Sequence, residues 1–283
     1  MKNIDMMKGA KKLVDVCAGV KENEKVLLVT DTNNVNIAEI IASVAFERGA
    51  EIAICIMTAR KSNGENPPEM ICHAMMKAEV IFAPTTYSIT WAEATRKAAS
   101  QGARVVSMPD YHEDILISGG LEADFPAQEK IVEKMSELFS KAHQARLTTP
   151  AGTDLSMQLG DRQGNSEKGF CSKPGEVCGP PNIESNIAPI EETANGKIVC
   201  DASIIHPDIR KVDDPVTFIV KDGFVVDIEG GGKAKRMKEV LAEAKDHTVY
   251  NIAELGIGFN PKAKIIGLMT EDAGCLGTAH IGL

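Results

Sequence analysis

With 283 residues, 43% of them hydrophobic, the chain is long enough to bury the cores of two ordinary domains. Its 40 acidic side chains exceed the 31 basic ones, which gives a formal net charge of −9 at pH 7. This balance disfavours nucleic acid and anionic membranes as partners, because both are bound by clustered Lys and Arg. We therefore expect a small molecule or a peptide as the partner.

The first half of the chain alternates short apolar runs with amphipathic stretches, which is typical of a parallel sheet covered by helices on both faces. Four runs predict strands, and three stretches with helical spacing predict the helices between them. The strands are residues 25–30, 51–57, 79–83 and 103–107, and the helices are residues 36–48, 68–77 and 90–100. Residues 1–145 are thus predicted to form a Rossmann-like α/β domain.

The end of the first predicted strand argues against a nucleotide site. The strand runs into Asp31-Thr-Asn-Asn34 instead of a GxGxxG turn, whose glycines let the backbone approach a pyrophosphate. The first domain is therefore expected to be a scaffold or a dimerisation domain, without a bound cofactor.

The second half is predicted to be rich in strands and turns. A long helix over about residues 127–145 leads into it. Residues 217–228 predict a hairpin, because Asp222-Gly223 interrupts two apolar runs, and residues 234–244 predict a further helix. We expect residues 146–283 to form a mixed α+β domain.

The seven cysteines indicate a reducing environment. Their number is odd and no CxxC pair occurs, which argues against a disulfide framework. The N-terminus lacks the apolar run and cleavage site of a signal peptide, and no stretch approaches the roughly 20 apolar residues of a membrane span. A soluble cytoplasmic protein is the expectation.

Three titratable residues of the second half lie in surroundings that suit a metal site. Glu184 lies in a loop rich in Pro and Gly, and His280 is flanked by small and apolar residues. Glu254 lies in an apolar run, where a buried carboxylate needs a cation, hydrogen bonds or a raised pKa. Each residue alone is more often a solvated acid or a core histidine. Together, two carboxylates and one imidazole suit zinc, cobalt, manganese or ferrous iron.

The order of three motifs resembles the aminopeptidase T family of metallopeptidases and its non-peptidase relatives, which include 2,5-dihydroxypyridine 5,6-dioxygenase. The motifs are the N-x-E-x-x-x-A-P loop at 182–189, the segment ELGIGFNP at 254–261 and the segment GTAHIG at 277–282. The resemblance implies a C-terminal metal-binding domain in a homodimer. It also implies that Glu184, Glu254 and His280 are metal ligands, with Glu176, in a Pro-Gly-Glu-Val context, as the competing choice for Glu184.

The sequence departs from the family pattern after His280. The resemblance implies a Tyr and a His-x-Asp pair as further ligands downstream, but the chain ends three residues after His280. The C-terminal domain is therefore expected to be truncated at its end. His206-Pro-Asp208 has the letters of such a pair but precedes the second motif, so we interpret it as a turn.

The resemblance implies two competing mechanisms. In a hydrolase that removes N-terminal residues from peptides, two metal ions (Zn, Co or Mn) would activate a water, with Glu254 as a ligand and Glu184 as a ligand or the base. In a ring-cleaving dioxygenase, one Fe(II) held by two His and one Asp would leave positions for substrate and O₂, with His280 as the first ligand and the glutamates in support. The two glutamates favour the aminopeptidase-type hydrolase. The dioxygenase is the alternative, and a catalytically silent binding or assembly protein is the third reading.

Overall fold

The computed structural model describes residues 2–283, which form two units. Unit 1 comprises the residues up to Gln128 together with Lys168–Ile183 and Asn260–Ala263. Unit 2 comprises Glu129–Glu167, Glu184–Phe259 and Lys264–Leu283. Each unit thus takes segments from both sides of residue 145. The sequence predicts instead two continuous domains, residues 1–145 and residues 146–283.

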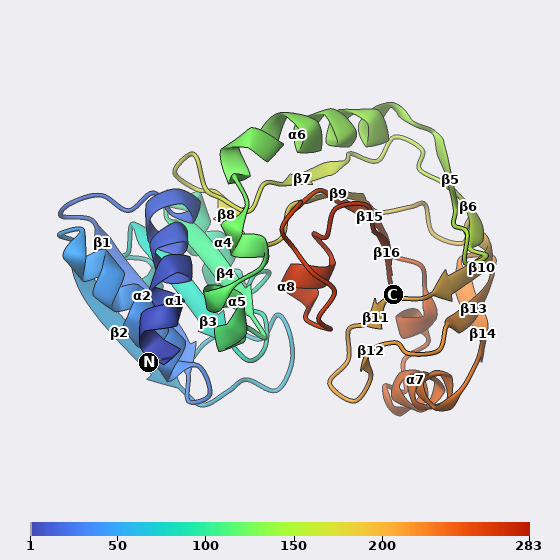
Figure 1. The fold of residues 1–283 in the computed structure, drawn as a ribbon, viewed down its shortest axis with the longest axis horizontal. Coiled ribbons are helices and arrows are strands. Elements are labelled where there is room, and N and C mark those ends of the chain that lie inside the picture. Colours follow the sequence, from blue (N-terminus) through green and yellow to red (C-terminus); the bar gives the residue numbers. More distant parts are fainter. Residues whose placement is uncertain (1) are drawn as a thin grey trace. The chain divides into compact units, whose positions relative to one another are not determined.

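Unit 1 is built on a parallel sheet, as the sequence predicts (Figure 1). The inner strands are almost wholly buried, which fits a sheet with both faces covered. In spatial order the strands are β2 (Glu51–Met57), β1 (Lys25–Asp31), β3 (Val80–Thr85), β4 (Arg104–Pro109) and β8 (Val177–Cys178). The Rossmann-like α/β character of the first domain is confirmed.

The helices of unit 1 include the three that the sequence predicts. The helix predicted at residues 36–48 ends just before Gly49, because Gly49 takes a left-handed conformation, with φ of +80°, that stops helix growth. The helices are α1 (Lys2–Lys12), the π-helix η1 (Leu13–Cys17), α2 (Val35–Glu47), α3 (Glu69–Met75), α4 (Glu93–Ser100), α5 (Glu113–Ile117) and the 3₁₀ turn η2 (Gly120–Glu122). Within residues 2–283 no helix is long and apolar enough to cross a membrane.

Unit 2 contains an antiparallel sheet packed against a helix. The predicted hairpin is confirmed, and both turn residues, Asp222 and Gly223, have positive φ. The predicted helix 127–145 runs too far, because α6 (Phe125–Lys141) ends before Gln144–Thr148, whose alternation of polar and apolar residues forms a strand. The sheet order is β14 (Phe224–Glu229), β13 (Val216–Lys221), β10 (Asn195–Cys200), β6 (Asp154–Gln158) and β5 (Gln144–Thr148), and α7 (Gly232–Glu243) packs on the hairpin.

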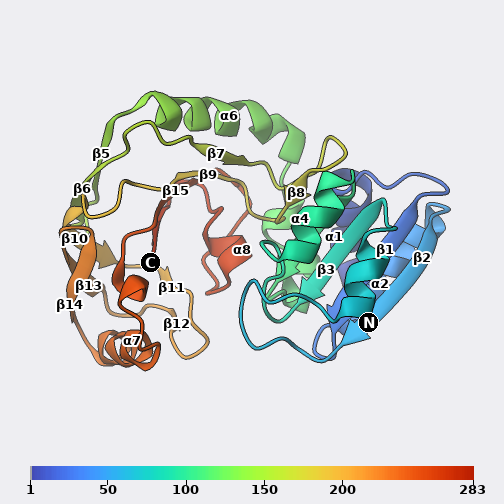
Figure 2. The same cartoon turned by 180° about the vertical axis from the view of Figure 1, so that it is seen from behind.

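The candidate ligands lie on a second antiparallel sheet of unit 2, whose backbone is drawn in Figure 2. Its order is β16 (Ala279–Gly282), β15 (Glu254–Gly258), β9 (Glu184–Ile187) and β7 (Asn165–Glu167). One face packs into the apolar core of the unit through Ile187, Leu255, Ile257 and Ile281. The remaining short elements are β11 (Ser203–Ile204), β12 (Arg210–Lys211), η3 (His247–Tyr250) and α8 (Met269–Asp272).

Candidate metal centre

Strand register places the three predicted ligands on one face of the second sheet of unit 2. Gly256 of β15 lies opposite His280, and Gly258 lies opposite Glu184. Because side chains alternate along a strand, Glu254, Gly256 and Gly258 share a face, and the residues opposite them share it too. Three segments far apart in the sequence therefore present their side chains to one surface.

The donor atoms of these side chains converge. One ligand atom each from Glu184, Glu254 and His280 lies within 4.8 Å of the other two. His280 Nε2 is 3.5 Å from Glu184 Oε2, and Glu184 is only 5% exposed. Glu184 Oε2 and His280 Nδ1 are buried without a hydrogen-bond partner among the described residues. Buried polar atoms are rarely left unpaired, and a cation at the cluster would satisfy the carboxylate oxygen.

Glycine residues make the space that the donors occupy. A Cβ atom on Gly256 would lie 2.1 Å from His280 Nε2, so the imidazole fills the place of a side chain at this position. On the neighbouring pair, a Cβ atom on Gly282 would lie 2.9 Å from the Cβ of Glu254. The Gly-rich spacing of the two C-terminal motifs thus has a steric reason.

Asn186 holds the carboxylate of Glu184, and Asn165 in turn holds Asn186. Asn186 Nδ2 donates to Glu184 Oε1 at 2.7 Å, and Asn165 Nδ2 donates to Asn186 Oδ1 at 2.9 Å. One oxygen of Glu184 is therefore fixed by the protein while the other faces His280. Hydrogen bonds of this kind orient metal ligands and tune their affinity.

Glu254 has the perturbed ionisation that its apolar flanks predict. Burial, followed by the charge of Glu184, raises its pKa, and His280 acts against this rise. A carboxyl group whose pKa is raised by burial and by a like charge gains most from a bound cation.

Glu167 is a further acidic residue of this surface, and the sequence reasoning missed it. It lies opposite Glu184 in the pairing of β7 with β9, which places it on the same face. Burial, followed by the charges of Glu184 and Glu254, raises the pKa of Glu167 to about 7. Its sequence neighbours are polar, so only the strand pairing reveals its position beside the cluster.

The other residues considered from the sequence lie outside the cluster. Glu176 belongs to unit 1, where its carboxylate accepts the backbone N–H groups of Ser172 at 2.6 Å and Lys173 at 3.0 Å. It therefore stabilises its own loop, and the cluster contains Glu184 instead. Asp208 follows His206 in a turn, as interpreted, and binds Arg236 at 2.8 Å.

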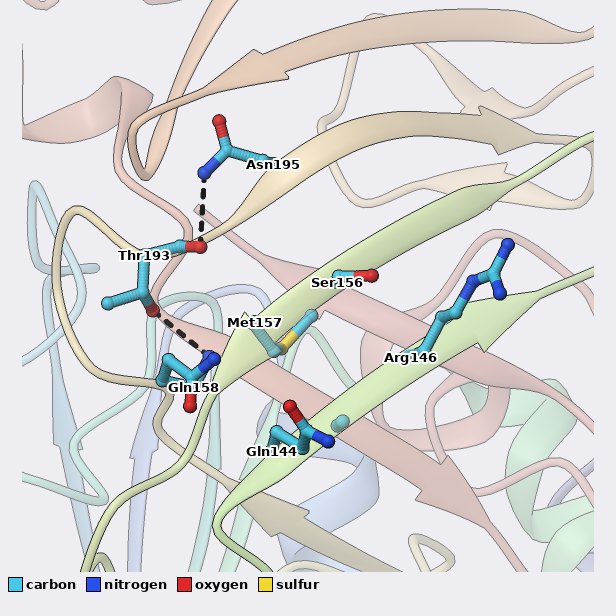
Figure 3. A pocket seen from close by; sticks show the side chains of 8 residues that line it. Gln144, Arg146, Ser156, Met157, Gln158, Thr193 and Asn195 are labelled. Carbon is cyan, nitrogen blue, oxygen red and sulfur yellow. Dashed lines mark hydrogen bonds between the residues drawn. The ribbon is translucent and has the colours of Figure 1, made fainter.

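A separate hollow of about 460 Å³ lies on the first sheet of unit 2 (Figure 3). Its lining contains no carboxylate, histidine or cysteine, so it offers none of the usual metal-binding side chains. Its one charged residue, Arg146, is held by Asp154 at 2.8 Å. The lining residues are Gln144, Ala145, Arg146, Ser156, Met157, Gln158, Thr193 and Asn195.

Two solved structures share the fold of this chain. The 2,5-dihydroxypyridine dioxygenase from Pseudomonas putida KT2440 superposes with a TM-score of 0.75 at 18% identity, covering 97% of this chain and 83% of that one. Wild-type AmpT from Thermus thermophilus superposes with a TM-score of 0.69 at 14% identity, covering 99% and 85%. The aminopeptidase T resemblance of the sequence is thus supported at the level of the fold.

The sequence comparisons are more specific. A 2,5-dihydroxypyridine 5,6-dioxygenase of Pseudomonas putida KT2440 is 28% identical over 136 residues, which are 48% of this chain and 39% of that protein. The matched region thus spans well under half of this relative. The model of the NicX family, 2,5-dihydroxypyridine 5,6-dioxygenase, matches residues 5–278. The chain therefore belongs to the 2,5-dihydroxypyridine 5,6-dioxygenase family.

Proposed function

We propose that this protein is a metal-dependent dioxygenase that uses Fe(II) and O₂ to open a dihydroxylated pyridine ring between carbons 5 and 6. The convergence of Glu184, Glu254 and His280 on one sheet face carries the proposal. Family membership over residues 5–278 supplies the reaction type. The sequence analysis favoured a hydrolase, and the family match moves the dioxygenase ahead of it.

The donor set suits Fe(II). Two carboxylate oxygens and one imidazole nitrogen are ligands that this cation accepts, and the two carboxylates balance its charge. The buried oxygen of Glu184 that lacks a hydrogen-bond partner is the atom best placed to contribute. In this proposal Glu184 and Glu254 would bind Fe(II) directly beside His280, instead of only supporting a triad of two His and one Asp, and the remaining coordination positions would be open to substrate and O₂.

The neighbouring side chains have distinct tasks in this proposal. Asn186 holds Glu184 by the 2.7 Å hydrogen bond, so that one carboxylate oxygen keeps its orientation. Glu167, with its pKa raised to about 7 by burial and by Glu184 and Glu254, exchanges a proton near neutral pH. A carboxylate with such a pKa is a suitable acceptor for the proton of a ring hydroxyl.

The test is oxygen consumption by anaerobically iron-loaded protein with 2,5-dihydroxypyridine as the substrate. The proposal predicts equimolar loss of O₂ and of the ring absorbance, with both lost in Glu254→Ala and His280→Ala. Loaded protein that leaves both the ring and O₂ unchanged would contradict it. Circular dichroism of each variant controls for unfolding.

A metallohydrolase is the second candidate, and the number of carboxylates favours it. Glu184, Glu254 and Glu167 together bring more negative charge than one divalent ion requires, and paired metal ions in hydrolases are held by such carboxylates. Release of the N-terminal residue from a peptide by Zn-, Co- or Mn-loaded protein, with about two ions per chain, would select this reading. Ring opening that needs Fe(II) and O₂, without release of N-terminal residues from peptides, would exclude the hydrolase.

A further inference from the structure

Two buried thiols face each other in unit 1. Cys171 and Cys178 are 5% and 4% exposed, and their sulfur atoms are 3.3 Å apart. The sulfur atoms of a disulfide lie about 2.0 Å apart, so a movement of about 1.3 Å would join this pair. The pair lacks the CxxC spacing, and only the fold reveals that the two thiols are neighbours.

The fold holds both ends of the loop that separates the two thiols. Cys178 lies in β8, which pairs with β4, and the backbone N–H of Cys171 donates to the carbonyl oxygen of Cys17 at 2.7 Å. Within the loop, the carboxylate of Glu176 accepts two backbone N–H groups. The loop is therefore closed before any bond joins the sulfur atoms, so the entropy of bringing them together is already lost on folding.

A third cysteine lies close to this pair, but the three do not form a metal site. Burial, with a smaller contribution from Cys171, raises the pKa of Cys17, and Lys12 acts against this rise. Within residues 2–283, the one group of three side chains whose ligand atoms lie within 4.8 Å of one another is the Glu and His cluster of unit 2. The sulfur atoms are thus too dispersed for a soft metal ion, and Cys171 and Cys178 stand as a pair.

We propose that Cys171 and Cys178 form a reversible disulfide when the protein meets a hydroperoxide. The thiolate of Cys171 attacks one peroxide oxygen and breaks the O–O bond, which gives a sulfenic acid and a hydroxide that takes up the thiol proton as water. The sulfur of Cys178 then displaces the hydroxyl group of the sulfenic acid, which leaves as a second water with the proton of Cys178. The two thiols lose two electrons to the peroxide, and a thiol reductant reverses the change.

Cys171 is the thiol that the oxidant reaches first. The three residues after it, 172–174, are exposed, so a local opening of this loop uncovers Cys171, whereas Cys178 is held in the sheet. Because both sulfur atoms are buried, the reaction depends on this opening. A small oxidant such as hydrogen peroxide is therefore favoured over a bulky one such as oxidised glutathione.

The test is oxidation of the folded, metal-free full chain with hydrogen peroxide, followed by alkylation of the remaining thiols in denaturant. Trypsin should release residues 169–197 as one peptide, because Pro174 blocks cleavage after Lys173. This peptide contains Cys171 and Cys178 and no other cysteine. We expect it to escape alkylation and to be lighter by two hydrogen atoms than the reduced peptide. Dithiothreitol should restore alkylation at both positions.

Two substitutions separate the pair from the other thiols. Cys178→Ala should leave a sulfenic acid on Cys171 that dimedone traps, without a link in the peptide. The matched control is Cys55→Ser on β2, at the opposite edge of the sheet from β8, and it should form the link as the parent does. The peptide from the parent protein decides the proposal even where Cys178→Ala fails to fold.

The link should also stabilise the protein. We expect the midpoint of thermal unfolding to rise by about 3–8 °C, because the bond closes a loop in the unfolded chain and requires little movement in the folded one. Full alkylation of Cys171 and Cys178 after oxidation, a link to Cys17, or a lower midpoint of the linked protein would overturn the proposal. The metal-free protein is used throughout, so the result does not depend on the proposed function.

Discussion

Gly256 and His280 lie directly opposite each other in the pairing of β15 with β16, and the imidazole occupies the volume that a side chain at 256 would need. A Cβ atom on Gly256 would be 2.1 Å from Nε2, far inside van der Waals contact. The absence of a side chain on one strand therefore determines where the imidazole on the next strand can lie. This pair fixes the position of the only nitrogen donor in the cluster.

Gly256→Ala should displace the imidazole and weaken metal binding. The added methyl group collides with the ring, and relief of such overpacking costs about 1–3 kcal/mol. We expect the free energy of unfolding to fall by about that amount and the dissociation constant for a divalent ion to rise by at least about tenfold. Calorimetric titration and denaturant unfolding measure the two effects.

Gly232→Ala is the matched control for this substitution. Gly232 begins α7, and no atom lies within 4 Å of a Cβ placed on it. This variant should bind metal as the parent does and should be as stable or slightly more stable. An equal loss of affinity in both variants would show that the contact between Gly256 and His280 is not the cause.

Asn186→Leu should weaken metal binding through Glu184. The substitution removes the 2.7 Å hydrogen bond to Oε1, so the carboxylate loses its fixed orientation. Loss of such a supporting hydrogen bond typically raises a metal dissociation constant by about 10- to 100-fold. Asn165→Ala, which removes only the support of Asn186, should have a smaller effect. Equal affinity of the parent and Asn186→Leu in a calorimetric titration would refute the role of Asn186.

The stability of the metal-free protein should fall as the pH rises from about 5 to about 7. Burial, followed by the charges of Glu184 and Glu254, raises the pKa of Glu167 from 4.5 to about 7. Between these values the folded protein keeps a proton that the unfolded chain has released, so deprotonation favours unfolding. The raised pKa of Glu254 acts in the same direction. Urea unfolding across this range should show a flatter pH dependence for Glu167→Gln, and parallel curves would contradict the assignment.

Binding of a divalent ion should release protons near pH 6.5. The ion favours the charged form of carboxyl groups beside it, so it lowers the pKa of Glu167 and Glu254. Titration calorimetry in buffers with different ionisation enthalpies counts the released protons. Glu167→Gln should release fewer of them while still binding the ion. An unchanged proton count in this variant would place the titrating group elsewhere.

The architecture of unit 1 could be predicted from local sequence patterns. Residues 51–57 and 103–107 are apolar runs of strand length, and Gly49 and Gly102 follow two of the three helices between the strands. Strand β8 could not be predicted, because Val177–Cys178 is too short to carry a periodic signal and pairs with β4 across a long stretch of chain. The end of α6 was missed because helical spacing and strand alternation are hard to separate over few residues.

The candidate site could be predicted only in part, because its geometry depends on strand pairing. Glu184, Glu254 and His280 were found through motif order, and the structure brings them together. Their role as metal ligands stays a proposal. Glu167 reaches the same face through the pairing of β7 with β9, which no local pattern encodes. Asn186 shares the face of Glu184 because the two residues lie two apart in β9, but the sequence analysis placed Glu184 in a loop, where this alternation does not apply. Contacts between distant strands thus define the part of the site that the sequence did not reveal.

The most direct test of the metal centre is elemental analysis after anaerobic loading with Fe(II) and removal of unbound ion. We predict about one iron per chain in the parent protein and loss of most of it in both Glu254→Ala and His280→Ala, each folded by circular dichroism. Val226→Lys, on an exposed strand of the other sheet of unit 2, should retain the iron. Undiminished iron in both site variants, or no iron in the parent, would contradict the metal centre.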